Sequence, residues 1–199
     1  MSTRSSELVD RMLAVLREDI LPLTRRGVRE GNKVFGAAIL EKDSLALIEV
    51  GTNEETANPL FHGEISCLNR YWRLPRNGRP GPADCFFLST HEPCPMCLAA
   101  IAWSGFDNFF YLFSYLDTRD EFEIPHDLDI LTEIFECSDG TYRRANAYWT
   151  STYLPDLIER GSPQEIARRQ AAVADLRASY EALSIEYQRT KSTQGIPLP

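Results

Sequence analysis

Two cysteines, Cys94 and Cys97, lie three positions apart in the segment HEPCPMC, where Pro93 and Pro95 restrict the backbone. Thiols at this spacing suit a disulfide, a redox dithiol or half of a metal site. The chain has five cysteines, an odd number without the spacing of a disulfide framework, which favours reduced thiols. On spacing alone, a redox dithiol and a zinc site are about equally well supported. A third interpretation is that both cysteines are simply buried in the core.

A histidine and a carboxylate upstream favour the metal. His62 and Glu64 belong to the segment HGEI, which opens a predicted helix as the cysteines open a later one. If adjacent crossover helices begin at one edge of a sheet, their N-termini converge, and His62, Cys94 and Cys97 meet. Two thiolates and one imidazole hold zinc with an open fourth position, which is the catalytic arrangement. Glu64 can then reach water beside the metal, as a base rather than a ligand.

A zinc ion that only stabilises the fold is the alternative. It needs a fourth protein ligand, which Cys67, Cys85 or His91 could supply, and it gives no reason for a carboxylate beside the histidine. Cys67, Cys85 and Cys137 are more simply interpreted as buried small apolar side chains, and His126 as a surface or turn residue. We therefore expect a catalytic zinc site.

Composition and charge exclude several functional classes. A chain of 199 residues fits one domain with a full core. With 21 Lys and Arg against 29 Asp and Glu, the net charge of −8 argues against nucleic acid as a partner. No apolar run approaches membrane-spanning length, and residues 1–10 are too polar for a signal peptide. We expect a cytoplasmic protein that does not bind membranes.

The predicted elements alternate in a way that positions these side chains. Strand, helix and strand around the cysteines imply a parallel pair with a crossover helix. The order predicts an α/β fold, a three-layer α/β/α sandwich with a central mixed sheet over residues 1–160 and a C-terminal helical extension over 161–199, packed on the same domain or a partner subunit. The expected helices are 6–27, 61–74, 98–105, 127–136 and 163–190, and the expected strands are 33–40, 45–51, 85–90 and 108–114.

The motif His62-Gly63-Glu64, followed by Pro93-Cys94-Pro95-Met96-Cys97, resembles the zinc-dependent cytidine/deoxycytidylate deaminase-like superfamily. Its pattern is most similar to bacterial guanine deaminases and fungal-type cytosine deaminases. The resemblance covers roughly residues 30–125, through the segments VFGAAIL, GTNEET, HGEIS and STHEPCPMCLAAIAW in that order. It implies a cytidine deaminase-like domain over residues 1–160 that binds Zn²⁺ and removes an exocyclic amine by hydrolysis, with release of ammonia.

The resemblance also implies substrate-binding roles. Asn53 matches a residue that contacts the base in cytosine- and guanine-type enzymes, and Phe35 matches an aromatic residue that lines the base pocket. The backbone N–H groups of Gly63 and Glu64 would help to hold the base. A turn asparagine and a core phenylalanine are the plainer interpretations of Asn53 and Phe35.

The identity of the substrate depends on weaker signals. An acidic residue reaches the substrate in guanine deaminases, and Asp117 is the best match, with Asp120 and Glu121 as alternatives; a solvated acidic loop is the competing interpretation. Residues 145–155 carry enough aromatic surface to form a lid, and the resemblance implies a homodimer. Guanine is therefore the favoured substrate.

Other functions stay open at this point. After guanine, the next candidate substrates are cytosine and a nucleoside. The next alternative is a tRNA adenosine deaminase, which the negative net charge of the chain disfavours. Last comes a non-catalytic interaction module stabilised by zinc, which would have no use for Glu64.

Overall fold

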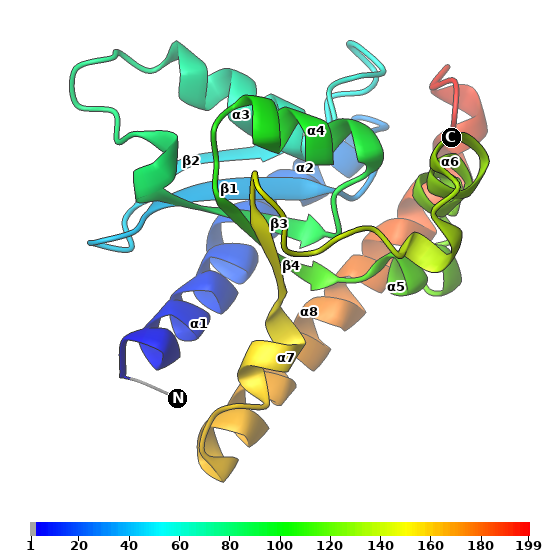
Figure 1. Cartoon of the computed structure of the whole chain (residues 1–199). Helices are drawn as coiled ribbons and strands as arrows, with labels where there is room; N and C mark the ends of the chain where they lie inside the picture. The colour runs from blue at the N-terminus through cyan, green and yellow to red at the C-terminus, as the bar shows by residue number, and fades with distance from the viewer. Residues whose placement is uncertain (1–2) are drawn as a thin grey trace.

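The computed structural model describes residues 3–199 as a five-stranded mixed sheet between two layers of helices (Figure 1). This arrangement confirms the predicted three-layer α/β/α sandwich. The strand order is β2-β1-β3-β4-β5. The strands are β1 (Gly36–Glu41), β2 (Leu47–Thr52), β3 (Cys85–His91), β4 (Asn108–Phe113) and β5 (Thr150–Tyr153).

Strand pairing follows the predicted hairpin and crossover. β1 pairs with β2 and with β3 in antiparallel fashion, whereas β3 and β4 are parallel, with Leu88 opposite Phe110. β5 is an addition that the sequence did not predict, and it extends the parallel part, with Asn108 opposite Thr150. Residues 145–155 were expected to form a lid. In the described chain, Thr150–Tyr153 of this segment form the edge strand β5.

The helices divide between the two faces of the sheet (Figure 1). α3 and α4 cover one face, whereas α1, α2, α7 and α8 cover the other. A π-helical turn, Leu16–Ile20, joins α1 to α2, and 3-10 turns occupy Pro82–Asp84, Ser138–Gly140 and Lys191–Thr193. The helices are α1 (Thr3–Val15), α2 (Leu21–Arg29), α3 (Gly63–Arg73), α4 (Pro95–Trp103), α5 (Tyr115–Asp120), α6 (His126–Phe135), α7 (Leu154–Ile158) and α8 (Pro163–Thr190).

The alternation of side chains along the strands separates two cores. Ala37 and Ile39 of β1 pack in the cluster under α3 and α4, whereas Ala38 and Leu40 pack in the cluster shared with α1, α2 and α8. Successive residues of a strand point to opposite faces, so both faces of this sheet are buried. Across residues 3–199, no helix combines the length and apolarity that crossing a bilayer requires.

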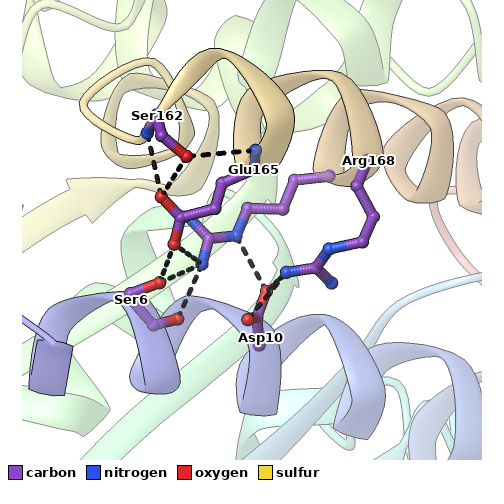
Figure 2. A network of polar contacts seen from close by, with 6 residues as sticks. Ser6, Asp10, Ser162, Glu165 and Arg168 are labelled. Carbon is purple, nitrogen blue, oxygen red and sulfur yellow. Dashed lines mark hydrogen bonds and ion pairs between the residues drawn. The ribbon is translucent and has the colours of Figure 1, made fainter.

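A polar network ties the C-terminal helix to the first one (Figure 2). The fully buried Arg169 of α8 donates from Nε to Asp10 Oδ1 at 2.8 Å and from Nη2 to Ser6 O at 2.9 Å. Arg168 donates to both oxygens of Asp10, and Glu165 accepts a hydrogen bond from Ser6. α8 therefore shares a core and a buried polar contact with α1, although 158 positions separate Arg168 from Asp10.

Candidate metal centre and active site

The first residues of two neighbouring helices carry the metal-ligating side chains. His62 is the N-cap of α3 and Cys94 is the N-cap of α4, and both have extended backbone torsions. Pro95 follows as the first residue of α4, where the missing N–H costs no helical hydrogen bond. The two helices lie on the same face of the sheet, so their N-termini approach each other (Figure 1).

His62, Cys94 and Cys97 meet as the sequence predicted. Their ligand atoms all lie within 4.8 Å of one another, and Cys94 Sγ lies 3.4 Å from His62 Nδ1. Two sulfurs and one imidazole nitrogen form a donor set that suits zinc and fills three of four tetrahedral positions. The residues present therefore fit a zinc ion with one position for solvent or substrate.

The environment of the three ligands shifts their proton affinities in different directions. A hydrogen bond from Cys97, together with the nearby His62, holds the pKa of Cys94 well below its usual range. Burial raises the pKa of Cys97. Burial by itself would lower the pKa of His62, but the hydrogen bond and charge of Cys94 outweigh it and raise the pKa to about 9. Without metal, a thiolate thus faces an imidazolium at the helix tips.

Glu64 lies directly beside this cluster. Its Oε1 accepts a hydrogen bond from Ser89 Oγ at 2.7 Å, and its Oε2 lies 3.4 Å from Cys97 Sγ. Burial raises the pKa of this carboxyl group. Ser89, on β3, is a functional candidate that sequence reasoning missed, since a serine in an apolar strand carries no motif.

A cavity of about 250 Å³ adjoins His62 and Cys94. Phe35 lines it, and no residue of the segment 145–155 does so among residues 3–199. Residues that follow α8, such as Ile196, line the cavity instead. The apolar lining includes Phe35, Leu60, Ile124, Ile130, Ile196 and Leu198, and the polar lining includes Lys33, Glu55, His126 and Asp127.

Asn53 and Gly63 form a hydrogen bond with each other, and neither is among the residues that line the cavity. The fully buried Asn53 accepts a hydrogen bond at Oδ1 from Gly63 N, at 2.5 Å, and donates from Nδ2 to Glu55 Oε2 at 2.6 Å. A Cβ on Gly63 would stand 2.7 Å from the Cα of Gly36, so a glycine is needed where α3 approaches β1. Both ends of the Asn53 amide are thus used within the protein.

The acidic residues expected to reach the substrate lie elsewhere. Asp117 caps α5 through Ser114 and lies 3.0 Å from Arg177, and neither it nor Asp120 nor Glu121 is among the residues that line the cavity. The short helix α5 turns this acidic segment toward α8. Asp127, at the start of α6, lines the cavity instead, and burial raises its pKa well above the usual range.

The other two histidines have contrasting places. His91 is buried among the rings of Phe35, Phe113 and Phe122, where burial lowers its pKa to about 3. It belongs to the aromatic core and is no fourth ligand. His126, expected on the surface or in a turn, lines the cavity, and its Nε2 lies 3.0 Å from Pro199 O.

The remaining cysteines behave as small apolar side chains. Cys67 and Cys85 are buried in the core under α3 and α4, away from the metal cluster, and Cys137 is partly buried beside α6. Burial raises the pKa of Cys67, which favours its neutral thiol. The alternative in which Cys67 or Cys85 completes a closed structural zinc site is therefore excluded by position.

Comparisons with known proteins agree with this geometry. Residues 15–113 match the model of the cytidine and deoxycytidylate deaminase zinc-binding region. Over 87 residues, the chain is 33% identical to a guanine deaminase of Bacillus subtilis (strain 168), covering 43% of this chain and 54% of that protein. It is 29% identical over 101 residues to a probable cytosine deaminase of Schizosaccharomyces pombe, covering 51% and 59%. It is 36% identical over 78 residues to a tRNA-specific adenosine deaminase of Rickettsia bellii, covering 38% and 52%.

These alignments span little more than half the length of the curated relatives. The structure is also similar to that of a guanine deaminase from Nitrosomonas europaea, with a TM-score of 0.51, 25% identity and coverage of 82% of this chain and 81% of that one. The three-ligand cluster falls inside the matched residues. Residues 15–113 belong to the cytidine and deoxycytidylate deaminase zinc-binding family, and His62, Cys94 and Cys97 within them are positioned to bind its zinc ion.

Proposed function

We propose that this protein is a zinc-dependent hydrolytic deaminase that removes an exocyclic amine from a free nucleobase or related small heterocycle. Guanine is the first candidate and cytosine the second. The observation that carries the proposal is the buried carboxylate of Glu64, held by Ser89 at 2.7 Å and 3.4 Å from the metal-ligand atom of Cys97. A purely structural zinc site has no use for that group.

Glu64 is the proton carrier of the proposed reaction. Zinc bound by three protein ligands with an open position supplies a water of lowered pKa. Glu64 accepts a proton from water and donates it to the ring nitrogen as the oxygen adds to the amine-bearing carbon. It then takes the second proton from the added hydroxyl group and passes it to the amine. The carbon–oxygen double bond forms as the carbon–nitrogen bond breaks and ammonia leaves. Burial raises the pKa of Glu64 above that of a solvated carboxyl group, which makes it easier for Glu64 to take up and carry a proton.

The cavity supports a small planar substrate. Its volume of about 250 Å³ lies below that of pockets for drug-sized ligands. Phe35 offers an aromatic ring, and the carbonyl oxygen of the Asp127 carboxyl group can accept a hydrogen bond from the N1–H or the amine of guanine. Guanine deaminases among the similar proteins favour the same order of substrates. The net charge of −8 disfavours a tRNA substrate.

The test is ammonia release by the zinc-loaded protein from guanine, cytosine, adenine, their nucleosides and aminated triazines. Glu64→Gln should keep zinc and fold but lower kcat by about 10²- to 10⁴-fold, because the proton carrier is lost. Glu54→Gln is the control, since Glu54 is partly exposed and paired with Arg70. If the Glu64→Gln variant stays active, Glu64 is not the proton carrier. No release from any compound, with zinc bound, would favour the non-catalytic module.

The expected homodimer and cytoplasmic location stay predictions. Light scattering of the purified protein measures the first directly.

A further inference from the structure

Two opposite charges are buried together in the wall of the cavity. Lys33 precedes β1 and Glu55 follows β2, and their side chains are 6% and 1% exposed. Lys33 Nζ lies 3.0 Å from Glu55 Oε1, and both residues line the cavity. Removing an ammonium and a carboxylate from water is costly, and such a pair is weak as a source of stability. Its place in the wall of the cavity points to a role in binding.

The carboxylate of Glu55 already has its partners within the protein. Oε1 accepts from Lys33 and lies 3.6 Å from His62 Nε2, and Oε2 accepts from Asn53 at 2.6 Å. The amide of Asn53 is also occupied, since its oxygen accepts the Gly63 N–H. Neither Glu55 nor Asn53 therefore has to be completed by a ligand.

The ammonium of Lys33 differs from these groups. It carries three N–H donors, and the bond to Glu55 uses one. Asp127, contributed by α6, supplies an acidic group to the same cavity. The cavity thus combines a cationic donor held by Glu55 with a separate carboxyl group, between apolar surfaces such as Phe35 and Ile130.

We propose that Lys33, fixed in place by Glu55, selects heterocycles that carry an exocyclic oxygen, by donating a charge-assisted hydrogen bond to that oxygen. The proposal rests on the proposed deaminase function and narrows it to amino-oxo rings such as guanine and cytosine. A ring without the oxygen would leave buried N–H donors of Lys33 unpaired, and an amino group there would set donor against donor. Sites that hydrogen-bond a substrate group reject analogues lacking it far more strongly than apolar pockets do.

The experiment compares substrates that differ in the oxygen, namely guanine with 2-aminopurine and cytosine with 4-aminopyrimidine. The ratio of kcat/KM within each pair is measured for the zinc-loaded protein and for the double variant Lys33→Met/Glu55→Leu. Both charges are removed together, because a single change would leave the other charge buried and unpaired. Intrinsic reactivity cancels when the ratios of the two proteins are compared. The preference for the oxo substrate should fall about 100-fold or more in the double variant.

Lys42→Met/Asp107→Leu is the matched control. Lys42 Nζ lies 2.9 Å from Asp107 Oδ1 in a solvent-accessible pair outside the cavity, so this double variant should keep the wild-type ratio. If the Lys33/Glu55 variant releases ammonia with the wild-type ratio, the inference is overturned.

A binding measurement separates this inference from the proposed function. Calorimetry on the zinc-loaded wild-type protein compares hypoxanthine with purine, and 2-pyrimidinone with pyrimidine, none of which has an amine to lose. We expect the oxo member of a pair to bind at least about tenfold more tightly. Equal affinities would overturn the role of Lys33 even where deamination is observed. Preference for the oxo ligand without ammonia release would uphold it while the proposed function fails. This measurement also decides the question if the double variant does not fold.

Discussion

Replacing Arg169 with methionine removes the buried guanidinium of the network in Figure 2 while keeping most of its aliphatic volume. The side chain is 0% exposed and joins α8 to Asp10 and Ser6 of α1. Arg168→Met is the natural comparison, because Arg168 is the adjacent residue, pairs with the same Asp10 and is 61% exposed. The two variants differ mainly in the burial of the lost charge.

The expected cost follows from the bonds that Arg169 makes. A hydrogen bond to a charged group contributes about 1.5–3 kcal/mol and a neutral one about 0.5–1.5 kcal/mol. Arg169 makes one of the first kind with Asp10, two of the second with Ser6 O and Ser6 Oγ, and a longer contact of 3.3 Å with Glu165 Oε1. Its Nη1 has no hydrogen-bond partner within residues 3–199, so part of the gain is offset by desolvation. We expect a net loss of about 2–3 kcal/mol in the free energy of unfolding.

For Arg168→Met the expected loss is about 0–1 kcal/mol, as for other solvent-exposed ion pairs. In a chain of this size, 1 kcal/mol shifts Tm by roughly 2–4 °C. Thermal unfolding should therefore show a decrease of about 4–12 °C for Arg169→Met and at most about 4 °C for Arg168→Met. Equal shifts, or an Arg169→Met protein as stable as the wild type, would refute the reasoning, because desolvation of the guanidinium would then cancel its hydrogen bonds.

Two further predictions concern the site. A chelator should abolish ammonia release, and added Zn²⁺ should restore it. His62, with a pKa of about 9, and Cys97, whose pKa burial raises further, must lose protons to bind metal, so zinc affinity should rise with pH through about 9 without levelling off there. Calorimetry in buffers of different ionisation enthalpy should detect this proton release, and its lack would contradict the assigned protonation of the ligands. Asp127→Asn should change the relative kcat/KM for guanine and cytosine, because Asp127 lines the cavity. Asp117→Asn should lower the free energy of unfolding by roughly 1 kcal/mol and leave the substrate order unchanged, because Asp117 caps α5. The reverse pattern would indicate that Asp117, and not Asp127, contacts the substrate.

The metal cluster could be predicted because its signals are local. His62 and Cys94 each stand where a helix begins, and the strand–helix–strand order around Cys97 requires a parallel crossover. Once two such helices lie on one face of the sheet, their N-termini must converge. Periodicity also predicted α8, although it could not say which residues α8 covers.

The wall of the cavity could not be predicted in the same way. Asp117 and Asp127 are both acidic residues that follow β4, and nothing in their local sequence distinguishes them. The turn made by α5 and the packing of α6 beside the site decide that Asp127 lines the cavity. Lys33 was likewise missed, because a lysine before a strand is usually solvated.

The sequence by itself determined the α/β sandwich, the three metal ligands and the neighbouring carboxylate of Glu64, since these depend on helix and strand periods and on short motifs. Only the tertiary structure decided that Lys33 and Glu55 are paired in the cavity wall, that Thr150–Tyr153 form an edge strand, and that Ile196 reaches the cavity. The physical reason is that these contacts join segments far apart in the chain, and their formation depends on which surfaces remain to be buried after the sheet and its helices have packed.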